Sequence, residues 1–585
     1  MKTHARMKAL SLFTALSLAL PGKAAAQHIR WVDSTMATLN LREKVGQLFV
    51  AELVALYTHR DHPAYQYALD IIKNYHIGTF ILGGGNTLDI PLITNKLQQA
   101  SKVPLFINGD LEAGMSYMHP WRLSRGWTDR LPKYISGGGT MFPSQMGIGA
   151  TGNPRYAYTF GYVTAREARA VGIQWSNSPV ADVNNNAENP IINTRSYGED
   201  PLMVGRMVDA YVRGARDGNM ISTLKHFPGH GDTREDTHMG LPSLPFDLER
   251  LKAVELVPFR AGIAAGADAV MTAHLALPKI DPTGRPATLS HPVLTGILRD
   301  SLGFDGIIIT DGMRMQGITD KFSPAEAAVS ALAAGADAIL ASEDIDAAYN
   351  GVLQAVRDGR LPEERITESV RRILLAKARV GLAERRTVDV DSVSQIVGSP
   401  EFQRAAEEMS DASVTLLRNE QQILPLGRTT RLHIVTVTEE PHPQVGTELF
   451  TEIEPFVGAA TVTRVSNETG RERFGEITAS LGQSDVILVG VYLSVVAWKG
   501  DRRFAAPLGD FLASLGSLSK PVILVAFGDP YILGKLPETQ VVMTPYAGST
   551  LAEQSVARVV SGRVKARGKL PVTIPGRYSL GAGNR

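Results

Sequence analysis

The chain of 585 residues contains no cysteine. It therefore cannot form disulfides, bind zinc or an iron–sulfur cluster through thiolates, or use a thiol nucleophile. An excess of charge of one sign is also missing, because 60 Lys and Arg balance 59 Asp and Glu and leave a net charge of +1. This balance gives no sign of a nucleic-acid-binding surface.

Long hydrophobic runs are absent too. No stretch reaches the roughly 20 apolar residues that a membrane span needs. Only 7% of the residues are aromatic, while the 44% hydrophobic and 20% charged fractions are ordinary for a globular protein. The length predicts two to four domains, or fewer if one of them is a large α/β barrel.

The first 26 residues have the three-part order of a secretory signal. Residues 1–8 are basic and contain no acid, Ala9 to Leu20 is apolar, and Ala24 to Ala26 offers small residues for cleavage. This order predicts cleavage after Ala26 and an exported, periplasmic protein. An amphipathic first helix or an uncleaved anchor is the alternative, although the apolar run is too short to span a bilayer.

From residue 27 to 384, short apolar segments alternate with longer amphipathic ones. Repeated β-then-α order predicts a parallel sheet, and seven or eight such units fit a (β/α)₈ barrel better than an open sheet. Helices are expected at Tyr156–Ala170, Leu202–Ala215 and Leu248–Ala265. The predicted strands are Gly78–Leu82, Pro104–Ile107, Ile173–Trp175, Ile221–Leu224, Ala269–Met271, Gly306–Thr310 and Ala338–Leu340.

Residues 385–400 read as a polar linker, and residues 401–585 as an α/β sandwich domain. Helices are expected there at Glu407–Leu417 and Leu551–Ser561. The predicted strands are Leu432–Val437, Ala460–Val465, Val486–Val491, Val522–Ala526 and Val541–Met543. In the first domain, Met115 to Thr140 fits neither helix nor strand and is expected to be a long loop near the site.

The densest group of reactive side chains lies between Lys225 and His238, directly after a predicted strand. Gly229 and Gly231, with Pro228, exclude a regular helix here. The segment is therefore a loop at the mouth of the predicted barrel, where active sites of this fold lie. A purely structural loop is one alternative. Zinc bound by His226, His230, His238 and Asp232 is another, but these residues lack the spacing of a helical metal site.

A second candidate is Asp311, which ends the apolar strand Gly306–Thr310. On a barrel this carboxylate would stand at the mouth, although it could instead cap the next helix. Asp110 and Arg195 are further candidates, each equally compatible with a structural role.

These residues resemble glycoside hydrolase family 3, and more narrowly its β-N-acetylglucosaminidase (β-N-acetylhexosaminidase) branch. The resemblance rests on the run Lys-His-Phe-Pro-Gly-His-Gly from Lys225, on Asp236-Thr237-His238 and on Thr310-Asp311. It extends over most of residues 40–380. A looser match in the second domain includes Gly568 to Pro575.

The resemblance implies a retaining mechanism with Asp311 as the nucleophile. His238 would be the acid/base and Asp236 would orient it. Imidazole suits this role because its ordinary pKa, near 6.5, lets it give and take a proton near neutrality. Asp110, Arg195, Lys225 and His226 would bind sugar hydroxyls. The substrate would be an N-acetylglucosamine-containing glycan, from peptidoglycan or chitin, and side chains alone would suffice, without cofactor or metal.

Two departures from the family pattern stand out. Met118 occupies a position where the family often has arginine, and Arg122 or Arg125 could substitute for it. No tryptophan follows Asp311, which favours the amino-sugar branch over β-glucosidases. A phosphorylase, a β-glucosidase and a catalytically inactive sugar-binding module remain as alternatives.

Overall fold

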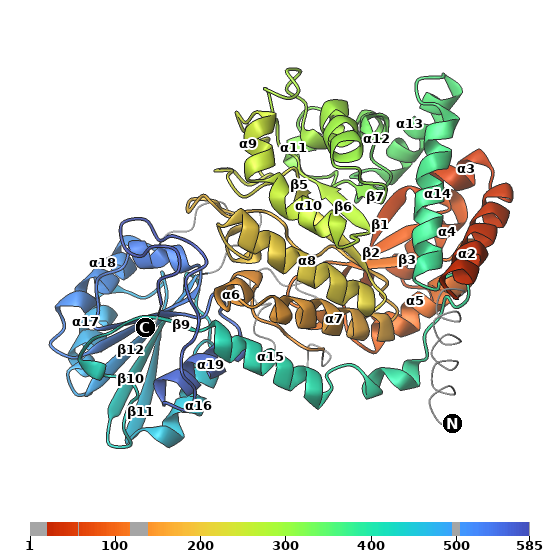
Figure 1. Ribbon diagram of the computed structural model, residues 1–585. Coiled ribbons are helices and arrows are strands. Elements are labelled where there is room, and N and C mark those ends of the chain that lie inside the picture. Colours follow the sequence, from red (N-terminus) through yellow and green to blue (C-terminus); the bar gives the residue numbers. More distant parts are fainter. Residues whose placement is uncertain (1–19, 57, 118–138, 494–503, 584–585) are drawn as a thin grey trace, which may run out of the picture.

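The computed structural model describes residues 20–56, 58–117, 139–493 and 504–583. The chain forms a barrel domain, red to green in Figure 1, and a second domain in blue, with helix α15 (Pro400–Ser413) between them. A (β/α)₈-type barrel followed by an α/β sandwich confirms the predicted fold class.

Eight parallel strands form the barrel sheet in the order β7-β6-β5-β4-β3-β2-β1-β8. A bridge between Ile309 and Ala338 joins β7 to β8 and closes it. The strands are β1 Phe49–Ala55, β2 Thr79–Gly85, β3 Phe106–Gly109, β4 Trp175–Ser176, β5 Ile221–Phe227, β6 Ala269–Thr272, β7 Ile307–Ile309 and β8 Ile339–Leu340.

Helices surround this sheet, and their first residues explain where they begin. Asn153, Asp200 and Ser323 each accept a backbone N–H with the side chain, and proline follows each of them. The surrounding helices are α3 Leu41–Gln47, α4 Pro63–Tyr75, α5 Asp89–Ala100, α6 Gln145–Ala150, α7 Pro154–Ala170, α8 Pro201–Asp217, α9 Leu248–Ala253, α10 Leu256–Ala264, the π-helix η6 Pro292–Ser301, α11 Gln316–Thr319, α12 Pro324–Ala334, α13 Ile345–Arg357 and α14 Glu363–Arg379.

The predicted strands correspond to β2 through β8, but β1 was not predicted. The single helix expected over Leu248–Ala265 is wrong, because Val254 (φ −126°, ψ −75°) interrupts it between α9 and α10. Of the loop expected between Met115 and Thr140, Met115–Tyr117 forms a 3₁₀ helix. Residues 118–138, which include Met118, Arg122 and Arg125, lie outside the described residues.

The second domain has a six-stranded sheet in the order β11-β10-β12-β13-β14-β9, with β9 antiparallel to its neighbour. Buried apolar clusters cover both faces of the sheet, so the domain is a layered sandwich. Its strands are β9 Thr415–Asn419, β10 Arg431–Val437, β11 Ala459–Val465, β12 Val486–Leu493, β13 Val522–Gly528 and β14 Val541–Thr544; its helices are α16 Thr447–Ile453, α17 Arg471–Leu481, α18 Ala506–Ser514 and α19 Thr550–Val560.

The helix expected over Glu407–Leu417 is partly wrong. Helix α15 ends at Ser413, and strand β9 begins two residues later. Inside the region predicted as a linker, Val390–Gln395 forms a 3₁₀ helix.

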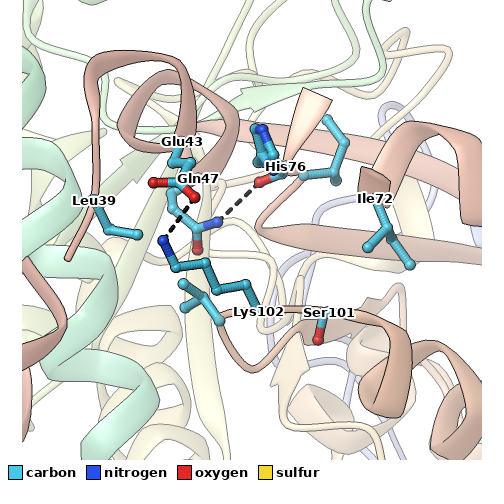
Figure 2. A pocket seen from close by; sticks show the side chains of 9 residues that line it. Leu39, Glu43, Gln47, Ile72, His76, Ser101 and Lys102 are labelled. Carbon is cyan, nitrogen blue, oxygen red and sulfur yellow. Dashed lines mark hydrogen bonds and ion pairs between the residues drawn. The ribbon is translucent and has the colours of Figure 1, made fainter. Parts of the chain in front are cut away.

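Helix α14 covers the base of the barrel, where the strands begin. Ile373 of this helix and Val380, which follows it, join the apolar cluster inside the sheet. A small pocket at this end is lined by Glu43, Gln47 and Lys102 (Figure 2), and Lys102 pairs with Glu43 at 2.7 Å. The pocket lies at the opposite end of the barrel from the predicted catalytic residues.

Helix α2 (Leu20–Ala37) packs against α14, with Asp33 paired to Arg371 at 2.7 Å and Val32 buried. Most of the predicted export signal, residues 1–19, lies outside the described residues. Cleavage after Ala26 would leave the α2 residues from Gln27 onward in place. No helix in the described part of the chain is long and apolar enough to cross a membrane.

Candidate active site

Residues from the ends of several strands gather at the mouth of the barrel. Asp110 follows β3, His274 follows β6 and Asp311 follows β7, while Lys225 and His226 lie near the end of β5. Parallel strands end on the same side of a barrel, which explains how residues up to 201 positions apart in sequence (311 − 110) come together.

A buried cluster of charges occupies one side of the mouth. The Lys225 ammonium lies 3.1 Å from Asp110 and 2.7 Å from Glu112. The Arg195 guanidinium donates two parallel bonds of 2.8 Å to the Glu112 carboxylate. Burial alone would raise the pKa of Glu112, but the charges of Arg195 and Lys225 outweigh it and hold that pKa well below its ordinary value. The cluster thus presents fixed donors and acceptors of the kind that bind hydroxyls.

His226 joins this cluster and is oriented by a buried carboxylate. Its Nδ1 lies 2.7 Å from the fully buried carboxylate of Asp182, which also accepts the backbone N–H groups of His226 and His230. A carboxylate can only accept, so Nδ1 carries the proton. Nε2 lies 3.4 Å from the guanidinium of Arg195.

His238 and Asp236 form a dyad on the loop after β5. Asp236 Oδ1 lies 2.6 Å from His238 Nδ1 and also accepts the backbone N–H of His238 at 2.9 Å. The Asp236 side chain is only 2% exposed, whereas that of His238 is 22% exposed. The buried carboxylate therefore fixes the orientation of a more accessible ring and sets the proton on Nδ1.

Asp311 is electrostatically coupled to three histidines. Burial would raise the pKa of its carboxyl, but His226, His274 and His238 together lower it to about 2. The backbone N–H of Gly312 also donates to Asp311 Oδ1 at 2.8 Å. The group is therefore ionised at neutral pH.

His274 supports the backbone on which Asp311 stands. Its Nε2 lies 3.1 Å from the carbonyl oxygen of Gly312, so Nε2 donates, and its Nδ1 lies 2.8 Å from the Thr288 hydroxyl. Burial lowers the pKa of His274. His274 thus holds the peptide directly after Asp311.

The histidines of the loop after β5 do not converge on one point. His230 is held between the hydroxyls of Thr233 (2.8 Å) and Thr237 (3.1 Å), and burial lowers its pKa to about 4. Asp232 instead lies 3.4 Å from Arg250. Within the described ranges, no three His, Asp or Glu side chains are arranged to hold a metal ion.

The structure thus joins Asp110, Arg195, Lys225 and His226 in one network and places the Asp236–His238 dyad within electrostatic range of Asp311. Sequence reasoning gave no role to Glu112, Asp182 or His274. The only signals for them were a carboxylate two residues after Asp110 and polar residues near strand ends.

Comparisons with known proteins agree with this architecture. Residues 40–376 match the model of the glycosyl hydrolase family 3 N-terminal domain, and residues 414–581 match its C-terminal domain. A β-N-acetylglucosaminidase/β-glucosidase of Cellulomonas fimi is 28% identical over 93% of this chain and 95% of its own length. Beta-hexosaminidase A of Pseudoalteromonas piscicida is 32% identical over 61% of this chain and 62% of its own.

Two solved structures superpose over nearly the whole chain. A family 3 β-N-acetylglucosaminidase from Paenibacillus is 32% identical and covers 92% of this chain and 99% of its own, with a TM-score of 0.80. A β-glucoside phosphorylase is 27% identical. The match covers 94% of this chain and 97% of the phosphorylase chain, with a TM-score of 0.81. With both domain models matched in order, this chain belongs to glycoside hydrolase family 3.

Proposed function

We propose that the protein is an exported, exo-acting, retaining β-N-acetylhexosaminidase. The main support for this proposal is that an ionised Asp311 and the His238–Asp236 dyad lie at the same barrel mouth, within electrostatic range of each other. The two groups provide a nucleophile and a proton donor for one glycosidic bond.

In the first step, Asp311 attacks the anomeric carbon and forms an ester bond to the sugar. The bond to the leaving oxygen breaks, and that oxygen takes a proton from Nε2 of His238. In the second step, neutral His238 takes a proton from water, whose oxygen attacks the anomeric carbon and releases Asp311. The sugar keeps its configuration because it is inverted twice.

Asp236 matters for both steps. Its bond to Nδ1 orients the ring and keeps Nε2 as the nitrogen that exchanges the proton in each step. The network of Asp110, Glu112, Arg195, Lys225 and His226 would hold the hydroxyls of a single terminal sugar, which supports exo action.

The proposed substrates are peptidoglycan fragments or chitin oligosaccharides with a terminal β-linked N-acetylglucosamine. The names of the Cellulomonas, Pseudoalteromonas and Paenibacillus relatives support this sugar. The test compares 4-nitrophenyl N-acetyl-β-glucosaminide with the corresponding glucoside, and then chitobiose with a muropeptide. Faster turnover of the glucoside would overturn the N-acetylhexosaminidase assignment.

The nucleophile is tested separately with a fluorinated sugar that accumulates as the glycosyl-enzyme. Peptide mapping should find the label on Asp311. A label on Glu112 or Asp232 would contradict the mechanism.

A phosphorylase is the second candidate, favoured by the similarity to the β-glucoside phosphorylase structure. A neutral His238 would repel incoming phosphate less than a carboxylate would. Turnover with and without phosphate, with analysis for sugar 1-phosphate, separates the two. Export is tested by fractionating cells that express the full chain and sequencing the N-terminus of the mature protein, which should begin at Gln27.

A further inference from the structure

The loop between β4 and α8 carries Arg195 and also lies against the second domain. Arg195 is the last residue of the 3₁₀ helix η4 (Asn193–Arg195). Its guanidinium reaches Glu112 in the barrel, as described above. The rest of the loop contacts residues of the second domain at both of its ends.

At the first end, the contact passes through Asn184, which is fully buried. Its Nδ2 donates to the hydroxyl of Tyr531 in the second domain at 2.7 Å. Its Oδ1 accepts the backbone N–H of Asn193, the first residue of η4, at 2.9 Å. One side-chain amide therefore connects the second domain to the helical turn that ends on Arg195.

At the other end, Glu199 is bound by the segment around Thr573. The Glu199 carboxylate accepts the backbone N–H and the hydroxyl of Thr573 at 2.7 and 2.6 Å, and the Glu199 N–H donates to the Pro571 carbonyl at 3.0 Å. The adjacent Gly198 packs so closely against Pro571 that an added Cβ would lie 2.5 Å from its carbonyl oxygen.

A third connection runs through α6. The Ser144 hydroxyl donates to the carbonyl of Tyr546 in the second domain at 2.8 Å. The next residue, Gln145, donates from its side chain to the Arg195 carbonyl at 2.7 Å. Three independent sets of contacts thus connect the second domain to the backbone around Arg195.

From these contacts we infer that the second domain sets the position of Arg195, with Tyr531 and Thr573 as positioning residues for sugar binding. This inference rests on the proposed function, because it requires Arg195 to contact the sugar. Neither Tyr531 nor Thr573 needs to touch substrate. Their effect passes through the loop, and it changes substrate affinity more than the rate of the chemical step.

The test measures KM and kcat for 4-nitrophenyl N-acetyl-β-glucosaminide and the inhibition constant of N-acetylglucosamine. Tyr531→Phe and Thr573→Val should each raise KM and the inhibition constant by about fivefold, since one net hydrogen bond is lost, and change kcat less than about twofold. Tyr156→Phe is the matched control. It removes a 3.0 Å hydroxyl contact to Glu408 between α7 and α15 that does not reach the loop, and it should leave all three constants unchanged.

A double-mutant cycle with Arg195→Lys separates this inference from the proposed function. If Tyr531 acts through Arg195, Tyr531→Phe should add little to the KM increase that Arg195→Lys causes alone. If the KM increases of the two single variants multiply in the double variant, the inference is overturned. It is also overturned if KM is normal in Tyr531→Phe but raised in Arg195→Lys. A normal KM in Arg195→Lys would contradict the sugar-binding assignment itself. If Tyr531→Phe does not fold, the same cycle with Thr573→Val decides.

Discussion

The two ends of the barrel hold buried charges of similar composition in different surroundings. At the base, Asp337 is completely buried and accepts from Arg299, Arg365 and Arg372, and from Ser369 and the backbone N–H of Ile308. At the mouth, Glu112 is bound by Arg195 and Lys225. Both carboxylates have a pKa below the ordinary value because neighbouring cations outweigh burial.

The two clusters differ in the groups that their members contact. The arginines around Asp337 come from η6 and α14 and also bind backbone carbonyls, such as those of Phe304 and Ala336. At the mouth, Lys225 also pairs with the Asp110 carboxylate, which is 38% exposed, whereas the Asp337 carboxylate at the base is fully buried. A depressed pKa in a buried ion cluster therefore does not identify an active site. The two clusters differ in their place on the barrel and in the accessible Asp110 carboxylate at the mouth, so variants at the two ends should fail in different ways.

The largest effect is expected at the mouth, from Asp311→Asn. Loss of the proposed nucleophile should lower kcat by at least about a thousandfold. The melting temperature, followed by circular dichroism, should stay close to that of the wild type. A variant that retains more than a tenth of the activity would remove Asp311 from the mechanism.

The next effect is expected from His238→Ala. General acid assistance contributes about 10²–10⁴-fold, and a good leaving group needs little of it. The variant should therefore lose far more activity on chitobiose than on a 4-nitrophenyl glycoside. Equal losses on both substrates would show that His238 is not the acid/base.

At the base, Asp337→Asn should reduce stability rather than catalysis. Leaving three arginines without their carboxylate should lower the free energy of unfolding by about 3–5 kcal/mol. Below the melting temperature, KM and kcat should remain near the wild-type values. Glu112→Gln is the matched variant at the mouth and should raise KM. A raised KM in Asp337→Asn would break the distinction between the two ends.

A last effect, on the pH dependence of stability alone, concerns Lys377, which is buried at the base beside Gln47 (2.8 Å) and the ring of Phe106. Burial, with the charge of Arg386, lowers its pKa from 10.5 to about 7. Below that value the lysine is protonated in both folded and unfolded chains. Between about 7 and 10.5 only the unfolded chain holds the proton, so this group makes stability rise with pH, by at most ~1.4 kcal/mol per unit.

Lys377→Met should remove this dependence. The variant should gain most stability over the wild type at pH 7 and least near pH 10, with unchanged KM. Urea unfolding at several pH values measures the free energy of unfolding of both proteins. A gain that grows with pH would contradict the lowered pKa.

Local sequence patterns predicted much of the fold, and the polar residues near strand ends that they singled out lie together at the mouth of the barrel. Strand β1 was missed because periodicity alone cannot assign a short apolar run such as Phe49–Ala55, which directly follows a helix. The boundary between α15 and β9 was missed because Val414 and Thr415 continue an amphipathic pattern. Glu112 and Asp182 gain their roles from partners 83 and 44 positions away, which no local pattern encodes.

The pairing of β7 with β8, which closes the barrel, affects hydrogen exchange and the resistance of the activity to heat and denaturant. One bridged pair joins β7 to β8, whereas two to six pairs join every other pair of neighbouring strands. The amides of Thr310 and Ala338, which bond across this seam at 3.0 and 3.1 Å, should therefore exchange with solvent before those of the β1–β2 seam. Asp311 follows Thr310 directly. Under heat or denaturant, activity should decline when this seam opens, before the barrel as a whole unfolds.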